Sequence, residues 1–549
     1  MKQDQPASPP KLGMKRLGRR RVVIGLAMLP TGFLLLWICL NVALPVREGK
    51  PLVRFAPDTT VISAPLNDKG DADYIEYLNK QQSICVTPEN NAVVLLIQAT
   101  GPIFRGTEVG EEFFTRLGVE PCPKQGAYLV EFDHWRKSNE FSVTDMPFGQ
   151  WWRETEAQLD FALANPWSAE QFPGLATWLR KNRKPLDLVR EASRRTRYYN
   201  PLIRRTETPL LISVDIGLSH ALKDFADLLA ISAMKHVHEG DVASALDDTL
   251  TIRRLARLLN QVSTNTIEQL ISVALEERAT KTEWRIAQSG KAAPQELANY
   301  LTQIAGLSPL KGIADPIDQG ERFAILEAMN KMGRNDQQFE MIDESLGFTR
   351  PLFVFCADWA TAARVINRSF DRLVSALKQE TFAKQVAALD EIGEEMKLMQ
   401  MKTSDPFRIA LVCASGRGAK GTHMGELLTQ VWTPSCHVLV YATWIVAAEH
   451  QLSQIVFALE IYKAKHGKYP KKLDDLIPEH FEKVPLDPFV EKPFQYTSTD
   501  DQYVLYSVGW DMTDDEVMQA KHPGTLKTDI HAEPNPQDWD KVLSELRDR

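Results

Sequence analysis

The chain has few cysteines and no excess of positive charge, and these two shortages exclude several classes of protein. Only 6 of its 549 residues are Cys, and none forms a Cys-x-x-Cys pair, so neither a disulfide scaffold nor a zinc ribbon is expected. The formal net charge is −8 at pH 7, which is not the basic footprint of a nucleic-acid-binding protein. We therefore expect no nucleic-acid partner.

Familiar catalytic motifs are also missing from the sequence. No HExxH, GxSxG, Walker A or kinase signature occurs. Gly416, Gly418 and Gly421 have dinucleotide-binding spacing, but no acidic residue follows at the required distance and no βαβ repeat surrounds them. We interpret that segment as a basic loop. His236 and His238 are two residues apart on a predicted helix, so they point about 200° apart and are expected to be ordinary surface histidines.

The composition is that of a globular protein, with 44% hydrophobic and 25% charged residues. A length of 549 residues predicts roughly three structural units. The strongest local signal is at the start, where residues 22–44 contain no charged side chain and are mostly apolar. About 20 such residues cross a bilayer as a helix. We therefore predict a transmembrane helix at 22–44.

The charges that flank this segment predict its orientation. Seven Lys and Arg residues precede it, and three follow it closely. The positive-inside bias then keeps residues 1–21 in the cytoplasm as a basic tail and places the chain from Pro45 outside. A cleaved signal peptide, a lipoprotein signal and a twin-arginine signal fit less well; Ile38, for example, stands before Cys39 where a lipoprotein needs a small residue. We expect a single-pass protein of the bacterial inner membrane whose bulk is periplasmic.

The remainder divides into a linker and two larger regions. Residues 45–71 are rich in Pro and charge and indicate a linker. Residues 72–436 predict an irregular, mostly helical region, clearest at 219–290, where apolar residues recur at steps of three and four. The break at Gly240-Asp241 gives a hairpin of the tetratricopeptide type. No second copy follows at 34 residues, so an irregular helical domain is favoured over a peptide-binding array.

The segment 437–549 predicts a small α+β domain. A long amphipathic helix ends at Gly467, and Pro470 prevents its continuation. Residues 494–496 and 503–506 read as two strands joined by a polar turn. Leu459 and Tyr462 of the helix should pack on the second strand. Either Tyr503 and Leu505 or Val504 and Tyr506 point at the helix, because strand side chains alternate.

This segment resembles the C-terminal domain of the major pseudopilin of type II secretion. The resemblance covers roughly residues 449–540, under a fifth of the chain, and is carried in order by His466-Gly467-x-Tyr469-Pro470, Leu473, Leu476, Pro485 to Pro488, Tyr506-Ser507-x-Gly509-x-Asp511 and Asp529-Ile530. The whole architecture resembles large membrane-anchored bacterial families that carry this module. Pseudopilins have a processing site directly before their apolar helix. Here Gly32-Phe33 lies inside the predicted span and lacks the following Glu, so pilin-like processing and polymerisation are not expected.

The resemblance also implies a calcium site in the loop after the last strand. The candidate ligands in this chain are Ser507, Asp511, Asp514, Asp515 and Asp529. Calcium takes six to eight oxygen ligands, and this loop could supply most of them. The alternative is a solvated acidic loop that binds nothing, because the segment 517–523 lacks the glycines of the family.

Together these inferences predict a mostly α protein with an N-terminal transmembrane helix, a helical middle region and a pseudopilin-like α+β domain. The leading hypothesis is a membrane-anchored scaffold or interaction protein of the envelope that is linked to secretion and binds an envelope protein partner. The alternative is an envelope hydrolase whose site is assembled from scattered residues. A hydrolase should show a concave pocket with converging titratable groups, whereas a scaffold should show a broad apolar or charged face.

Overall fold

The computed structural model describes residues 50–104, 107–137, 148–204, 210–214, 216–335, 346–433, 436–513 and 530–531. The described chain is mostly helical, which confirms the predicted class. The predicted transmembrane helix at 22–44 lies outside these residues. The chain divides into two compact units, one from residues 1–72, 328–368 and 396–432 and the other from 73–327, 369–395 and 433–549.

The first unit combines helices with an irregular N-terminal segment. Its helical residues belong to α13 (Arg322–Gly333), η3 (Gly347–Thr349), α15 (Arg350–Cys356), α16 (Trp359–Leu377), α17 (Phe382–Ser404), α18 (Pro406–Ala414) and α19 (Arg417–Trp432). Residues 50–71 contain no helix or strand. Arg334 donates two hydrogen bonds, of 2.5 and 2.8 Å, to the carboxylate of Asp71 at the end of this segment. The backbone N–H of Leu52 donates to the same carboxylate at 2.8 Å.

The glycine triplet of this unit does not form the loop expected from the sequence. The apolar run before it is helix α18, and Gly418 and Gly421 lie within helix α19. A Cβ atom on Gly421 would come 2.2 Å from the carbonyl oxygen of Asp358. Glycine is therefore needed here for close packing of the chain, which the spacing alone did not reveal.

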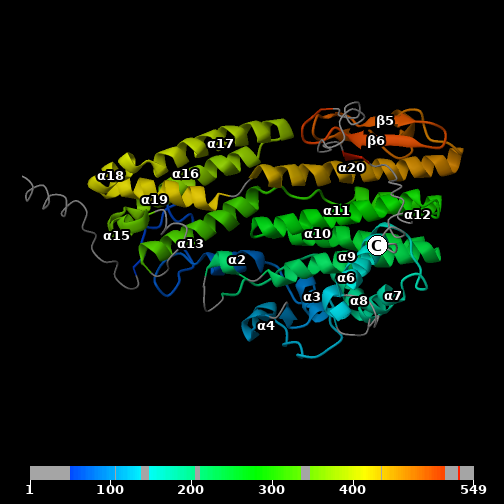
Figure 1. Cartoon of the computed structure of the whole chain (residues 1–549), viewed down its shortest axis with the longest axis horizontal. Helices are drawn as coiled ribbons and strands as arrows, with labels where there is room; N and C mark the ends of the chain where they lie inside the picture. Colours follow the sequence, from blue (N-terminus) through cyan, green and yellow to red (C-terminus); the bar gives the residue numbers. More distant parts are fainter. Residues whose placement is uncertain are drawn as a thin grey trace, which may run out of the picture. The chain divides into compact units, whose positions relative to one another are not determined.

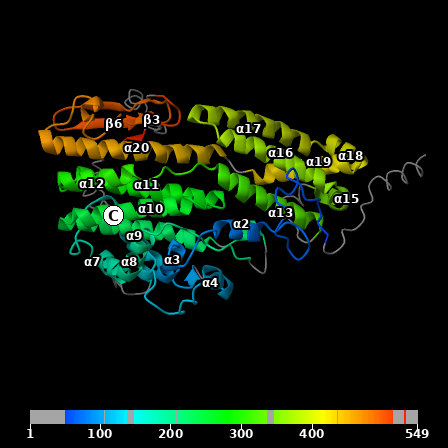
Figure 2. The ribbon, with the colours of Figure 1, turned by 180° about the vertical axis from the view of Figure 1, so that it is seen from behind.

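The second unit is built around three long helices, α9 (Gly217–Glu239), α10 (Val242–Asn260) and α11 (Thr266–Gln288). They lie side by side in both views (Figures 1 and 2), and they confirm the helical prediction for 219–290. Gly240 has a φ of +83°, which ends α9 in the left-handed conformation. Asp241 then caps α10, because its carboxylate accepts the backbone N–H of Ser244 at 3.1 Å.

Shorter elements cover these helices. They are α2 (Tyr74–Gln82), α3 (Ala92–Thr100), β1 (Ile103–Phe104), β2 (Thr107–Glu108), α4 (Glu111–Leu117), α5 (Phe132–Lys137), α6 (Phe148–Ala164), α7 (Pro173–Lys181), α8 (Arg183–Ala192), η1 (Leu211–Ser213), α12 (Pro294–Ala305) and η2 (Pro316–Glu321). Strands β1 and β2 form an antiparallel pair. Helix α8 packs on α3, and α6 packs on α9, so the apolar faces of these helices join one core.

The C-terminal segment has the predicted long helix and small antiparallel sheet. Helix α20 (Cys436–His466) lies along α11 and α12, and strands β5 (Gln495–Ser498) and β6 (Tyr503–Ser507) lie on its other side (Figures 1 and 2). Strands β5 and β6 are antiparallel, with Ser498 opposite Tyr503, and β7 (Ile530–His531) pairs with β6. The short helix η4 (Leu473–Leu476) and the pair β3 (Leu486–Asp487) and β4 (Lys492–Pro493) complete the segment.

The contact between α20 and the sheet shows which residues of β6 face the helix, which the sequence alone did not decide. Leu459 is fully buried in a cluster that also contains Tyr503 and Leu505, so these two strand residues face the helix. Tyr462 is half-buried and packs against the same cluster, as predicted. Because α20 also packs on α11 and α12, its apolar residues join the sheet and the helical body in one continuous core.

One stretch, Arg417–His466, is long and apolar enough to cross a membrane by length and composition; it comprises α19 and α20 and includes residues 434 and 435, which are not described. A third of its most apolar window, 33%, is buried inside the protein. Its α20 portion contributes Phe457 and Leu459 to the core of the second unit, and core helices of soluble proteins pass the same test. It is a different segment from the span predicted at 22–44.

Candidate functional site

Four helices of the second unit enclose a groove of 840 Å³. Its walls come from α7, α8, α9 and α10, with Ala169 from the preceding loop. Charged side chains dominate the lining, namely Arg180, Arg183, Asp187, Arg190, Lys235, His236, Asp247 and Asp248.

Helical spacing explains how these side chains meet. On α8, Arg183, Asp187 and Arg190 recur at steps of four and three, which places them on one face of the helix. Val189 points away from these three residues and is buried in the core, whereas the buried Leu186 also lines the groove. The same rule aligns the polar residues of α9 and α10 that line the groove. Each helix therefore packs by its apolar face and turns its charged face to the groove.

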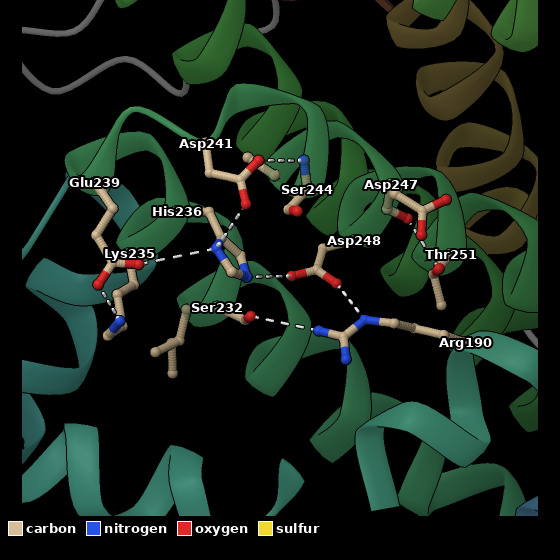
Figure 3. Close-up of polar contacts among 12 residues, drawn as sticks. Arg190, Ser232, Lys235, His236, Glu239, Asp241, Ser244, Asp247, Asp248 and Thr251 are labelled. Carbon is tan, nitrogen blue, oxygen red and sulfur yellow. Dashed lines mark hydrogen bonds and ion pairs between the residues drawn. The ribbon is translucent and has the colours of Figure 1, made fainter. Parts of the chain in front are cut away.

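Arg190 makes polar contacts with Ser232 and Asp248 (Figure 3). Its Nε donates to Asp248 Oδ1 at 2.7 Å, and its Nη1 donates to Asp187 Oδ1 at 3.0 Å. Its Nη2 reaches Ser232 Oγ at 3.5 Å. Burial disfavours the charge on Arg190, but the neighbouring Asp248 and Asp187 outweigh it and raise the pKa of the guanidinium. Arg190 therefore stays charged and joins α8 to α9 and α10.

His236 lies among three carboxylates in the same region (Figure 3). Its Nε2 is 3.9 Å from Asp248 Oδ2, and its Nδ1 is 3.8 Å from Asp241 Oδ2 and 3.9 Å from Glu239 Oε2. These distances are too long for hydrogen bonds, although they are ion-pair distances when the ring is protonated. His238 is exposed, as expected, but His236 is half-buried and not an ordinary surface residue. Sequence reasoning missed it because Asp248 comes from the next helix.

The groove lacks the geometry of a nucleophilic enzyme. Ser232 Oγ contacts Arg190, and in the described residues it has no hydrogen bond to His236. An activated serine needs such a bond to a base. The described part of the chain also holds no group of three or more His, Cys, Asp or Glu side chains that could bind a metal ion. The ion pairs of Arg190 and the exposed Arg180 and Arg183 form an arrangement that can bind a charged ligand.

The balance of charge in the groove is positive. Arg190 pairs with Asp187 and Asp248, and Asp247 pairs with Arg194 outside the lining at 2.9 Å. Arg180 and Arg183 are exposed, and neither has a carboxylate partner within the described ranges. Two guanidinium groups therefore remain for an anionic ligand. Carboxylates bind guanidinium through two parallel hydrogen bonds, which makes them suitable partners.

The predicted calcium ligands lie mostly outside the described residues. Asp514, Asp515 and Asp529 are not described. Ser507 is buried, and its hydroxyl accepts the backbone N–H of Gly509 at 3.1 Å. Asp511 Oδ1 accepts the backbone N–H of Thr513 at 3.0 Å. Calcium binding at this loop stays a prediction.

Another residue stabilises the chain next to that loop. Asp487 is buried, and its two carboxylate oxygens accept the backbone N–H groups of Phe489 and Val508, both at 3.0 Å. These bonds tie the segment Pro485 to Pro488 to the end of β6. The acidic residue between the two prolines therefore has a structural role.

The described part of the chain contains five cysteines that form no disulfide with one another, namely Cys85, Cys122, Cys356, Cys413 and Cys436. Cys436 is buried and Cys85 is exposed. None of the possible disulfide pairs forms among these residues.

Comparison with known proteins gives no family for this chain. No family model matches it, and neither a curated protein nor a solved structure matches it. The resemblance of residues 449–540 to the pseudopilin domain therefore stays a prediction from the sequence.

Proposed function

We propose that this protein is a membrane-anchored interaction protein of the bacterial envelope. Residues 22–44 hold it in the inner membrane, and its bulk lies in the periplasm. The groove between α7 and α10 is its binding surface, and an acidic segment of a partner protein is the ligand. The pseudopilin-like segment suggests a partner linked to secretion.

The observation that carries this proposal is the pair Arg180 and Arg183. They line the same groove, are exposed, and lack carboxylate partners in the described part of the chain, whereas the groove's own carboxylates are already paired. A guanidinium fork is preorganised for carboxylates, and the two positive charges left without carboxylate partners also attract an acidic partner as it approaches.

The second candidate is an envelope hydrolase, and the approach of His236 to Asp248 favours it. A buried carboxylate near a histidine resembles part of a catalytic relay. The separation of 3.9 Å and the pairing of Ser232 with Arg190 count against it. A hydrolase would need a nucleophile that moves into contact with His236 when substrate binds.

A peptide-binding measurement tests the proposal. The full chain in detergent is titrated into a fluorescein-labelled decapeptide of alternating Glu and Gly, and anisotropy is recorded at 50 mM and 300 mM salt. We expect saturable binding that weakens with salt. The double variant Arg180→Ala/Arg183→Ala should weaken it at least tenfold. The control Lys468→Ala/Lys471→Ala removes two exposed positive charges elsewhere and should leave it unchanged.

Two results would contradict the proposal. One is an affinity for the Glu peptide no greater than for a matched Lys peptide. The other is equal loss of binding in the groove variant and in the control, because that would make the interaction a general effect of net charge.

A further inference from the structure

A buried ionic network lies between α10, α11, α12 and α20. Arg253 of α10 is fully buried and bonds to Glu276 and Glu283 of α11. Tyr300 of α12 donates to Glu283 Oε2 at 2.8 Å. Arg257 donates to Glu276 Oε2 at 2.7 Å, so two arginines balance two glutamates.

His450 of α20 completes this network in one defined protonation state. Arg253 Nη1 lies 3.1 Å from His450 Nδ1. A guanidinium group can only donate, so Nδ1 must accept and the ring must carry its proton on Nε2. Burial and the neighbouring Arg253 lower the pKa of His450 to about 3, which keeps the ring neutral at physiological pH. Among the described residues, Nε2 has no hydrogen-bond partner.

His450 also lines a cavity of 290 Å³ that is separate from the groove. Most of the cavity wall is apolar, including Leu310, Ile313, Leu377, Val440, Trp444 and Ala447. Such a wall with a few placed polar groups is the usual form of a small-molecule site. The cavity could hold a ligand whose apolar body contacts these residues.

The polar groups of the cavity specify the rest of the ligand. His450 offers one N–H donor at Nε2. Gln451 Oε1 is buried without a hydrogen-bond partner in the described part of the chain, and both residues line the cavity. A buried acceptor without a hydrogen-bond partner is unfavourable, so a donor on the ligand is favoured there. Because Glu276 already neutralises Arg257, an anionic ligand would lack a counter-ion, and the Nε2 donor of His450 disfavours a cationic group at the same place.

We propose that this cavity binds a small, uncharged and largely apolar alcohol. The hydroxyl oxygen accepts the Nε2 hydrogen of His450, and the hydroxyl hydrogen is donated to Gln451 Oε1. The apolar body packs on Trp444 and its apolar neighbours. This site is independent of the groove between α7 and α10.

Three fluorescent naphthalenes test the chemistry of the site with the full chain. 2-Naphthol has both a donor and an acceptor, 2-methoxynaphthalene has only an acceptor, and 2-naphthoate is charged. We expect saturable binding of 2-naphthol. 2-Methoxynaphthalene should bind about tenfold more weakly, because it cannot donate a hydrogen bond to Gln451. 2-Naphthoate should also bind about tenfold more weakly, because its negative charge has no counter-ion in the cavity.

Two matched substitutions on α20 locate the binding. Ala447→Trp fills the cavity and should reduce the affinity for 2-naphthol at least tenfold. Val438→Trp adds the same ring at an exposed position on the same helix and should leave the affinity unchanged. Gln451→Leu should weaken 2-naphthol binding five- to tenfold and leave binding of 2-methoxynaphthalene unchanged. Circular dichroism confirms that each variant is folded.

Several outcomes would overturn the proposal. They are no saturable binding of 2-naphthol up to its solubility, equal effects of Ala447→Trp and Val438→Trp, and tighter binding of 2-naphthoate than of 2-naphthol. If Ala447→Trp does not fold, Gln451→Leu decides, because its effect must differ between the two uncharged probes.

Discussion

Glu449 should make the stability of the second unit fall as pH rises. It is buried on α20, and its Oε2 has no hydrogen-bond partner within the described ranges. Burial, with a smaller contribution from Glu277, raises the pKa of Glu449 from 4.5 to about 8, although Lys281 and Arg253 oppose this. The folded protein therefore binds a proton between pH 4.5 and 8 that the unfolded chain has released. This stabilising effect is complete below pH 4.5 and is lost as pH rises through 8.

The size of the effect follows from the two pKa values. One pKa unit corresponds to about 1.4 kcal/mol, so the raised pKa costs roughly 3 kcal/mol of stability at pH 7 and roughly 5 kcal/mol above pH 8. Glu449→Gln keeps the size of the side chain and removes its charge. We therefore expect the variant to match the wild type near pH 4.5 and to be more stable by these amounts at higher pH.

Urea unfolding followed by tryptophan fluorescence measures this difference at pH 5, 7 and 9. The comparison with wild type isolates Glu449, because the other groups that titrate remain in both proteins. Glu112→Gln changes an exposed carboxylate of the same unit and should shift stability by less than about 0.5 kcal/mol at every pH. A stability difference for Glu449→Gln that does not grow between pH 5 and 9 would refute the reasoning.

Four further measurements test other parts of the account. Arg253→Met should lower the free energy of unfolding by about 3–5 kcal/mol, because the buried Glu283 loses its charged partner and Glu276 keeps only Arg257; a change below 1 kcal/mol in urea unfolding would argue against the network. Leu459→Ala should cost about 2–5 kcal/mol, and an unchanged melting curve would show that α20 does not pack on the sheet. A reporter active only in the periplasm should be active when fused after Arg549, and less so when the four arginines before residue 22 become Glu; cytoplasmic activity of the unmodified fusion would reverse the topology. Calorimetry should detect calcium binding that Asp511→Ala and Asp529→Ala each abolish, whereas no heat at millimolar calcium would exclude the site.

Local patterns in the sequence predicted much of the helical and C-terminal structure. The apolar repeat at 219–290 gave α9, α10 and α11, because a helix that buries one face must repeat every three or four residues. Leu459 was expected on the buried side of α20 for the same reason, and it is fully buried. The strands β5 and β6 were recognisable from aromatic and apolar residues on either side of a polar turn.

The groove and the buried network could not be predicted, because their residues are distant in the sequence. Arg190 and Asp248 are 58 positions apart, and Arg253 and His450 are 197 apart. The residues next to Arg253 in the sequence form no pattern that distinguishes it from the exposed arginines of the chain. Only the packing of α20 against α10 and α11 places the buried acceptor His450 Nδ1 beside Arg253. Gly421 was misread in the same way, since its close contact is with Asp358, 63 positions earlier.

Photo-crosslinking from the groove in living cells tests the central claim most directly. A benzophenone amino acid replaces Ala243, which is exposed and lines the groove, and mass spectrometry then identifies the crosslinked peptide. The account predicts one envelope protein, crosslinked through a segment rich in Asp and Glu, and loss of that product in the double variant Arg180→Glu/Arg183→Glu. The same probe at the exposed Val438 should not give the product. A product that persists after this charge reversal, or a crosslinked segment without excess acidic residues, would contradict the account.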